Sequence, residues 1–372
     1  LIADQAIMRL GGCNAVRGTA TPAEELKYIL NDSRSVALFI QNSLIWKKLA
    51  LNEDQLRQLK VVIQLEGSAD DGVLSWDSLL NLGQDSSNDL VRTFNADNPR
   101  ESSQIATIIY TSGTTGRPKG VPLSHSNLLH QIKSLACIAN PSPGSPVLSV
   151  LPIWHAYERS AEYYFFSCGC SQTYTTIKNL KEDLSKVRPV VMATVPRLWE
   201  AIQLGFEDVV CQMPPFRRSI IRLALLNSTN YKASLREAKE LVIERIPTIN
   251  RIQSWLEVFC RWPLHSLSAW LLWPKIVNRL SGGRLEYPIN GGGAIAPHVD
   301  SFFEALGIEL LVGYGLTETS PVVSCRRPWQ NIRGSSGSPL PDTEFKIVDP
   351  ETGIQKSFRE QGKIFVKGPQ VM

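Results

Sequence analysis

The 372-residue sequence has no CxxC pair, no internal repeat, no low-complexity segment and little excess charge of either sign. Its seven cysteines are odd in number and widely spaced, which excludes a disulfide framework or a clustered zinc site and favours reduced thiols in a reducing compartment. The 39 Lys and Arg against 35 Asp and Glu leave a formal net charge of +4. This excess is too small to indicate a nucleic-acid partner by itself.

The composition is that of a chain that buries a sizeable core, with 43% hydrophobic and 20% charged residues. Short β-branched runs alternate with helical patterns, and this alternation predicts an α/β fold of parallel sheets covered by helices. The predicted strands are residues 36–40, 60–65, 106–110, 147–151, 170–175, 190–194, 287–290 and 308–312. The predicted helices are residues 22–31, 124–138, 156–167, 179–187, 196–209 and 297–306.

The pattern changes after residue 334, where two strands at 345–348 and 363–366 flank a turn-rich link. We therefore expect an α/β body over residues 1–334 and the start of a small β-rich subdomain over residues 335–372. Because the chain starts at Leu1, within a helical pattern, and stops directly after a strand-like run, we expect a fragment cut at both ends. A targeting peptide can therefore not be judged absent.

A hydroxyl- and glycine-rich run follows the strand predicted at residues 106–110. It reads Thr-Ser-Gly-Thr-Thr-Gly-Arg-Pro-Lys-Gly at residues 111–120 and does not match the Walker spacing. Its glycines permit close backbone approach, its hydroxyls and amides can donate to phosphate oxygens, and Lys119 supplies a positive charge. We expect a phosphate loop that leads into a helix near Ser124; the alternative is a solvated turn.

Two more glycine-containing runs follow predicted strands. Gly-Tyr-Gly-Leu-Thr-Glu at residues 313–318 lies at the strand end where open α/β sheets bind ligands. There Tyr314 offers a flat face to a base, Thr317 a hydroxyl, and Glu318 a hard oxygen ligand for Mg²⁺. Asn-Gly-Gly-Gly-Ala at residues 290–294 lets a planar ligand lie against bare backbone. Taken alone, each run also fits a solvated turn or a tight connection.

Together and in this order, the three runs resemble the core motifs of the adenylate-forming superfamily of acyl-CoA synthetases, luciferases and peptide-synthetase adenylation domains. The segments Leu-Pro-Ile-Trp-His-Ala-Tyr-Glu-Arg at 151–159 and Val-Pro-Arg-Leu-Trp-Glu at 195–200 look like its long-chain fatty-acid branch. A basic helical insert at residues 211–281 and the run Arg-Arg-Pro-Trp at 326–329 are most similar to cyanobacterial and plastid acyl-[acyl-carrier-protein] synthetases.

The resemblance implies a role for each matching residue. The triple-glycine turn would line the adenine pocket through Gly292, Gly293 and Ala294, with Tyr314 and Gly315 beside the ring. Thr317 would contact the α-phosphate, and Glu318 would hold Mg²⁺. His155 or Trp154 would lie where the acyl carboxylate meets the nucleotide; a helix start with a packed ring is the alternative for His155, and a metal pair with Glu158 lacks a third ligand. The β- and γ-phosphates would be held by Thr111, Ser112, Gly113, Thr114, Thr115, Gly116 and Lys119.

The implied activity is ATP-dependent activation of a long-chain fatty acid to an acyl-adenylate, followed by transfer to the thiol of CoA or of the phosphopantetheine of acyl carrier protein. Alternatives are another acid, aryl or amino acid, on the same fold, or a non-catalytic nucleotide- or lipid-binding scaffold. The family's Thr-Gly-Asp motif and the lysine of its small C-terminal domain are not in this sequence. We therefore expect weak ATP binding and little adenylation by these 372 residues alone.

One segment has a distinct composition. Between Arg217 and Arg279 lie eleven Lys/Arg and four Asp/Glu, a net charge of +7, together with Trp255, Trp262, Trp270 and Trp273. We expect a basic, Trp-rich helical insert over residues 211–281 that attracts an acidic carrier protein or an anionic lipid surface. A helical insert with buried Trp and a solvated basic rim is the alternative. The expected location is cytoplasmic, peripheral at a membrane, or plastid if the source is a plant; no nucleic-acid partner is expected.

Overall fold

The computed structural model describes residues 1–85, 101–112 and 116–372. The chain divides into two compact units, Leu1–Asn127 and Leu128–Val371. This division falls elsewhere than the boundary expected at residues 334/335, and a separate β-rich subdomain beginning at residue 335 stays a prediction. Each unit is described by itself.

The first unit contains a small parallel sheet of order β1-β2-β3, in which Ala37 of β1 pairs with Val61 of β2. Ile40, Leu49 and Val62 form its buried core. The elements of this sheet and its helices are α1 (Ile2–Arg9), α2 (Ala23–Asp32), β1 (Ala37–Ile40), α3 (Ser43–Leu49), α4 (Glu53–Gln58), β2 (Val61–Gln64), β3 (Leu74–Ser75) and α5 (Trp76–Asp85).

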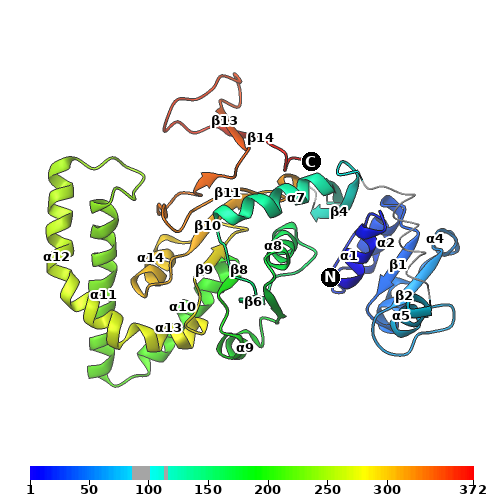
Figure 1. Cartoon of the computed structure of the whole chain (residues 1–372), viewed down its shortest axis with the longest axis horizontal. Coiled ribbons are helices and arrows are strands. Elements are labelled where there is room, and N and C mark those ends of the chain that lie inside the picture. Colours follow the sequence, from blue (N-terminus) through cyan, green and yellow to red (C-terminus); the bar gives the residue numbers. More distant parts are fainter. Residues whose placement is uncertain (86–100, 113–115) are drawn as a thin grey trace. The chain divides into compact units, whose positions relative to one another are not determined.

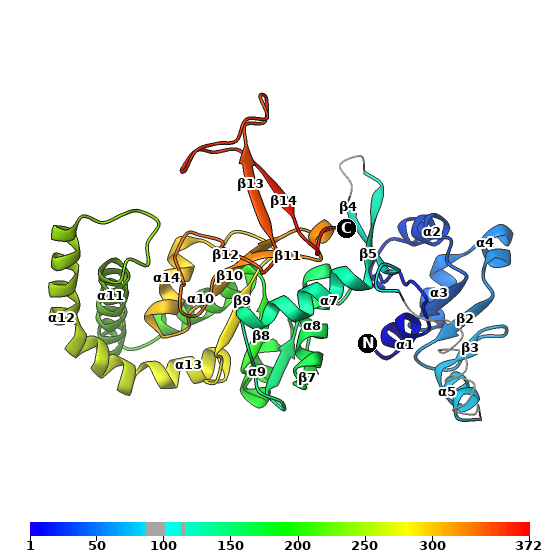
Figure 2. The same cartoon turned by 45° about the horizontal axis from the view of Figure 1, so that its top comes forward.

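The same unit carries an antiparallel hairpin of β4 (Ile105–Ser112) and β5 (Pro118–Ser124), visible in Figure 2. The helix expected near Ser124 is confirmed, since α7 (His125–Ser134) begins there, but the sequence missed strand β5, which runs from the end of the expected phosphate loop to this helix. Strand β5 pairs along its length with β4 before α7 begins. The sequence did not predict this strand because it contains Pro118 and Pro122. Proline within a run of residues argues against a strand in a sheet interior and is confined to edge strands.

The second unit is built on a seven-stranded sheet of order β12-β11-β10-β9-β8-β6-β7. The five strands from β10 to β7 are parallel, whereas β11 and β12 pair antiparallel. The predicted parallel sheets covered by helices are thereby confirmed. The strands are β6 (Pro146–Ser149), β7 (Ser171–Tyr174), β8 (Val191–Thr194), β9 (Tyr287–Asn290), β10 (Leu311–Gly315), β11 (Val322–Cys325) and β12 (Ser338–Pro339).

Helices cover this sheet on its two faces, as Figure 1 shows. Aromatic packing joins α10 to α14, because Trp199 meets Phe303 edge-to-face at 4.7 Å between ring centroids. The covering helices are α8 (Ala156–Ser167), α9 (Leu180–Val187), α10 (Pro196–Cys211) and α14 (Pro297–Ala305), with the short turns η1 (Leu135–Cys137) and η2 (Thr317–Thr319). Strand β10 begins three residues later than expected and includes Gly313 and Gly315, so glycines placed in a loop belong to a strand.

Three helices make up residues 211–281 almost entirely: α11 (Pro215–Ala238), α12 (Thr248–Leu271) and α13 (Trp273–Ser281). After the sheet, β13 (Glu344–Val348) and β14 (Lys363–Lys367) form an antiparallel hairpin. Across the described residues, none of the helices combines the length and apolarity needed to cross a membrane.

Candidate functional site

The order of the strands places a crevice at the carboxyl ends of β6, β8, β9 and β10. The chain runs from β6 outward to β7 and then returns to β8 on the other side of β6. Such a reversal leaves a gap between diverging connections, where open α/β sheets bind their ligands. Residues that directly follow three of these strands line one cavity here, namely Val150 after β6, Val195 after β8 and Gly291 after β9, and the end of β10 itself contributes Tyr314 and Gly315.

This cavity encloses about 720 Å³ and lies wholly within the second unit. Its volume falls in the range of roughly 300–1,000 Å³ that is usual for small-molecule sites. Part of its wall is formed by glycines and polar groups of the strand ends, which we call the polar mouth. Another part of the wall is apolar and is formed by Leu135, Ile138, Ala139, Ala161, Tyr164 and Phe165. The site therefore combines a polar mouth with an apolar wall.

Glycine is required at two positions of the polar mouth. A Cβ at Gly315 would overlap the backbone carbonyl of Pro321, which cannot move without breaking the β10–β11 turn. A Cβ at Gly291 would lie 3.1 Å from the ring of Tyr157, whose hydroxyl donates a hydrogen bond of 3.1 Å to the carbonyl of Ile289. Bare backbone thus faces the cavity, as a flat ligand requires.

The structure brings together five of the predicted site residues from the second unit around this cavity. They are His155, Gly292, Tyr314, Gly315 and Thr317. His155 is exposed at the start of α8, where its side chain makes no capping hydrogen bond. The structure therefore places His155 both at the cavity and at the N-cap position of α8, which is the helix start of its alternative role.

Three predicted residues are chain neighbours of this group. Gly293 and Ala294 are exposed in the turn after β9, and Glu318 is half-buried in η2 directly after Thr317. None of these three residues is among the described residues that line the cavity. The carboxylate of Glu318 is thus placed beside the polar mouth and not inside the cavity.

The predicted phosphate-binding residues occupy the end of the β4–β5 hairpin in the first unit. Lys119 lies directly across the hairpin from Thr111, and Ser112 pairs with Pro118. Ser112, Gly116 and Lys119 are exposed, and Gly116 has a φ of 81°. The predicted residues Gly113, Thr114 and Thr115 lie outside the described residues.

Two buried polar residues of the cavity escaped the sequence analysis as site residues. Asn290 is fully buried at the end of β9, lines the cavity, and has no hydrogen-bond partner for either amide atom in the structure described. Glu158 is 2% exposed on α8, and one of its carboxylate oxygens also lacks a partner there. The pKa of the Glu158 carboxyl is raised to about 8, chiefly by burial; a hydrogen bond with Ser149 lowers it and the nearby Glu162 carboxylate raises it. Unpaired buried polar groups are costly, so both residues are candidates for ligand contact.

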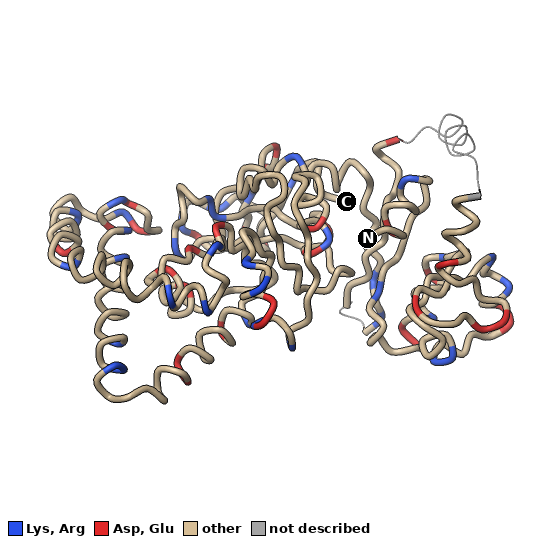
Figure 3. The backbone as a smooth tube through the Cα atoms, turned by 60° about the horizontal axis from the view of Figure 1, so that its bottom comes forward, with Lys and Arg blue, Asp and Glu red and all other residues tan. Residues whose placement is uncertain are grey.

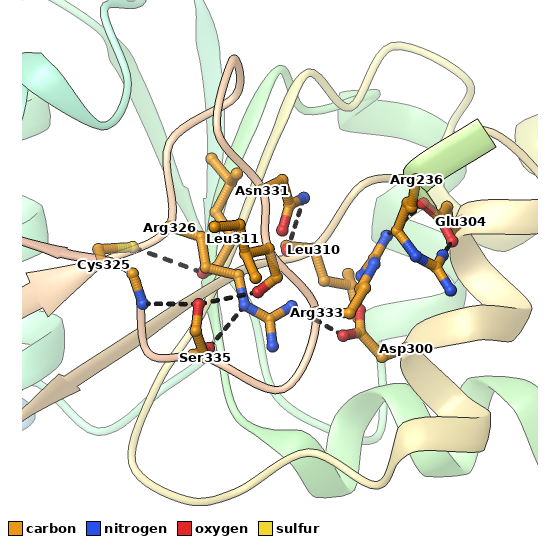
Figure 4. Close-up of polar contacts among 12 residues, drawn as sticks. Arg236, Asp300, Glu304, Leu310, Leu311, Cys325, Arg326, Asn331, Arg333 and Ser335 are labelled. Carbon is orange, nitrogen blue, oxygen red and sulfur yellow. Dashed lines mark hydrogen bonds and ion pairs between the residues drawn. The ribbon is translucent and has the colours of Figure 1, made fainter. Parts of the chain in front are cut away.

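A buried ionic cluster surrounds α14 (Figure 4). Asp300 of α14 is 3% exposed and forms ion pairs with Arg326, at 2.7 Å, and with Arg333. Glu304, one turn further along α14, pairs with Arg236 of α11 and with Arg333. Burial lowers the pKa of Arg326 to about 10 and that of Arg333 to about 9. The cluster fixes α14, and α14 directly follows the glycine turn.

This cluster changes the interpretation of the Arg-Arg-Pro-Trp run. Arg326 and Arg327 are buried, and Arg327 donates hydrogen bonds to the backbone carbonyls of Cys325 and Pro339. Trp329 is 70% exposed. The two arginines therefore brace the connection between β11 and β12 and do not face the cavity.

A doubly wound sheet, a glycine-bordered cavity at its switch point and a hydroxyl-rich hairpin with a lysine together define a nucleotide-binding enzyme fold of the adenylate-forming class. The chain belongs to the family of AMP-binding enzymes, whose pattern matches residues 1–372. It is 39% identical over its whole length to "Long-chain-fatty-acid--[acyl-carrier-protein] ligase AEE15, chloroplastic" of Arabidopsis thaliana, and 38% identical to "Probable acyl-activating enzyme 16, chloroplastic" of the same plant. The chain spans 54% of the length of each of these relatives.

Solved structures show the same fold. All of this chain superimposes on 61% of a long-chain-fatty-acid-CoA ligase (FadD1) from Archaeoglobus fulgidus, with a TM-score of 0.65 and 18% identity. Nearly all of it, 99%, superimposes on 72% of the N-terminal domain of FACL13 from Mycobacterium tuberculosis, with a TM-score of 0.66 and 15% identity.

Proposed function

We propose that this chain is the adenylate-forming part of a ligase that activates a long-chain fatty acid with ATP and passes the acyl group to a thiol. The observation that carries the proposal is the single cavity whose wall combines the glycine turn and Tyr314 with an apolar part. Such a cavity suits a molecule with an adenine at one end and a hydrocarbon chain at the other. The names of the relatives, which include fatty-acid ligases for acyl carrier protein and for CoA, support it.

The residues fit the groups that this reaction requires. Mg²⁺ is commonly held by one or two carboxylates together with substrate phosphates, and Glu318 beside Thr317 offers one carboxylate at the polar mouth. No cluster of three His, Cys, Asp or Glu that could hold a metal by itself occurs in residues 1–85, 101–112 and 116–372. A magnesium ion shared between Glu318 and the phosphates of ATP agrees with both facts. Bound there, it would neutralise phosphate charge.

The chemistry divides between binding and positioning. A carboxylate oxygen of the fatty acid attacks the α-phosphorus of ATP, the bond to pyrophosphate breaks, and an acyl-adenylate forms. Thr317 would donate to the α-phosphate, and His155 would lie beside the acyl carboxylate. Lys119 and the hydroxyls of Thr111 and Ser112 would hold the β- and γ-phosphates. Fixed donors at the points where charge develops supply most of the rate in reactions of this type.

The second half-reaction needs a thiol, which we propose is that of CoA or of the phosphopantetheine of acyl carrier protein. Its sulfur attacks the acyl carbon, AMP leaves, and a thioester forms. A carrier-protein acceptor is favoured by the relative that is named as an acyl-carrier-protein ligase. A plastid location is favoured by both chloroplastic relatives, because both match the entire chain. A cysteine of the protein itself is not required for this step.

The experiment measures binding of acyl-sulfamoyl-adenosines, stable analogues of acyl-adenylates, to the 372-residue chain by calorimetry. We expect the palmitoyl analogue to bind at least about 100-fold more tightly than the acetyl analogue, because each buried methylene contributes about 0.8 kcal/mol. Equal affinities for both would contradict a fatty-acid substrate. Tighter binding of a benzoyl or aminoacyl analogue would favour another acid on this fold, and no binding of any analogue would favour a non-catalytic scaffold.

A further inference from the structure

Helices α11 and α12 form an antiparallel hairpin whose outer surface is rich in large apolar side chains. The two helices lie side by side in both views (Figures 1 and 2), and the Asn227 side chain donates a 3.1 Å hydrogen bond to the Arg261 carbonyl across the pair. On α12 the exposed fractions reach 78% for Phe259 and 76% for Trp270. The other exposed apolar residues of α12 are Ile249, Ile252, Trp255, Leu256, Trp262, Leu264, Leu267 and Leu271.

The contact between the two helices is polar, by contrast. Ser228 of α11 is fully buried and lies 2.9 Å from a ring nitrogen of His265 on α12. Further along the pair, Ser254 donates to Glu237 at 2.7 Å, and Ser234 donates to Glu257 at 2.8 Å. A helix of a water-soluble protein normally turns its apolar face inward and its polar face to water. Helix α12 has largely the opposite arrangement, since two of its three buried residues are serines, whereas Ile221 and Leu225 of α11 pack against the core of the second unit.

Small and polar residues between helices, with apolar residues outside, are typical of helices in a lipid environment. Neither helix is apolar enough to span a bilayer. The exposed side chains of α12 recur every three or four residues, so they form a stripe along its length. A stripe of this kind, containing Trp and Phe, suits a helix that lies in the plane of the interface.

The charges of the segment indicate which surface it would meet. Residues 217–279 carry a net charge of +7, and their Lys and Arg are marked in Figure 3. Six of these cations are exposed and have no acidic partner among the described residues: Arg217, Arg222, Lys239, Arg245, Lys275 and Arg279. Exposed basic residues around an apolar and aromatic face complement anionic headgroups.

Two other occupants fit less well. A second copy of the chain would bring a +7 segment against another +7 segment, and like charges oppose such an interface. An acidic protein would need cations across the face, but the exposed α12 residues from Trp262 to Leu271 include no charged side chain.

We propose that the α11–α12 hairpin docks on the surface of an anionic lipid bilayer, with the apolar face of α12 in the interface and the flanking Lys and Arg at the headgroups. The proposal does not rest on the acyl-adenylate reaction, because it uses no residue of the cavity. It adds a location for the protein at a surface where fatty acids partition.

The test is flotation of the 372-residue chain with vesicles of phosphatidylglycerol and phosphatidylcholine in equal parts, and with vesicles of phosphatidylcholine alone. We expect the chain to float with the mixed vesicles, and less with phosphatidylcholine alone or at high salt. The double variant Phe259→Asp/Trp262→Asp should lower the bound fraction about tenfold or more, because it places charges in the apolar face. Both side chains are exposed, so the fold should be retained, which circular dichroism and binding of the palmitoyl analogue check.

The matched control is Phe358→Asp, which replaces an aromatic residue that is 88% exposed in the turn after β13. It should float like the unmodified chain. Flotation unchanged by Phe259→Asp/Trp262→Asp overturns the proposal. So does equal flotation with neutral vesicles, or a dimer in sedimentation velocity that this double variant converts to a monomer.

Discussion

At the scale of single residues, Glu158 should make the stability of the protein depend on pH. Its folded-state pKa is about 8, chiefly because of burial, whereas a carboxyl of an unfolded chain has a pKa near about 4.3. Between these values the folded state keeps a proton that the unfolded state releases. The free energy of unfolding therefore falls as the pH rises from about 4.3 to about 8. Below about pH 4.3 the carboxyl of Glu158 does not change it, because both states hold the proton.

The variant Glu158→Gln removes this pH-dependent loss. We expect its Tm to exceed that of the unmodified chain by several degrees at pH 8, since about 1 kcal/mol shifts Tm by roughly 2–4 °C in a domain of this size. At pH 5 the difference should shrink toward zero. Thermal scans by circular dichroism at pH 5, 6.5 and 8 measure this, and a difference that grows toward acid pH would contradict the assignment.

Glu158 also shows why part of the site could not be predicted from the sequence. It lies in α8, where Arg159 and Glu162 are buried as well, although charged residues in a helix normally indicate its solvated face. The glycines, Tyr314 and Thr317 were predictable, because their order along the chain is characteristic. The amide of Asn290 was not singled out, since only the structure shows that both of its polar atoms are buried and unpaired.

At the scale of elements, the ionic cluster on α14 makes Asp300 a structural requirement. Asp300→Ala leaves the guanidiniums of Arg326 and Arg333 buried without this carboxylate. We expect a loss of about 3–5 kcal/mol in the free energy of unfolding, as for other broken buried ion pairs. Urea unfolding measures it. The control Glu351→Ala removes an exposed carboxylate and should cost less than about 0.5 kcal/mol; equal losses would show that the cluster adds nothing.

Helix α8 forms a wall of the cavity, and its residues should set the length of the acyl chain. Ala161→Phe adds a ring to that wall at a position that is 7% exposed. We expect affinity for the palmitoyl analogue to fall about tenfold or more and affinity for the hexanoyl analogue to change little, because overpacking excludes only the longer chain. Ser167→Phe adds the same ring on an exposed site of α8 and should change neither affinity. Equal losses for both analogues would contradict a role in chain length.

Most elements were predictable from hydrophobic periodicity, and α8 and β9 were predicted with the bounds that the structure shows. Two of the strands that were missed or misplaced share a cause. Strand β5 contains Pro118 and Gly120, and β10 contains Gly313 and Gly315, which are residues that indicate turns. These strands form because their backbone pairs with a neighbouring strand, and this long-range contact leaves no local pattern.

At the scale of the whole molecule, the residues that we assign to the triphosphate and the residues that border the cavity belong to different units, so their roles can be tested separately. Lys119 would act only on the β- and γ-phosphates, which an acyl-adenylate lacks. Lys119→Ala should therefore lower the affinity for Mg²⁺–ATP about tenfold and leave the affinity for the palmitoyl analogue unchanged, because only one of the two ligands has phosphates for it to hold. Calorimetry with both ligands measures this, with Lys346→Ala, an exposed lysine of β13, as the control. A loss for both ligands would contradict this division of roles.

Every residue that borders the cavity comes from the continuous stretch Leu128–Val371. On the proposed function, selectivity for the organic acid would be encoded in this uninterrupted stretch and not in the hairpin that we assign to the β- and γ-phosphates. Exchange of this stretch between two related ligases should transfer the choice of acid in one step. Evolution could have altered that choice without changing the residues that bind the triphosphate.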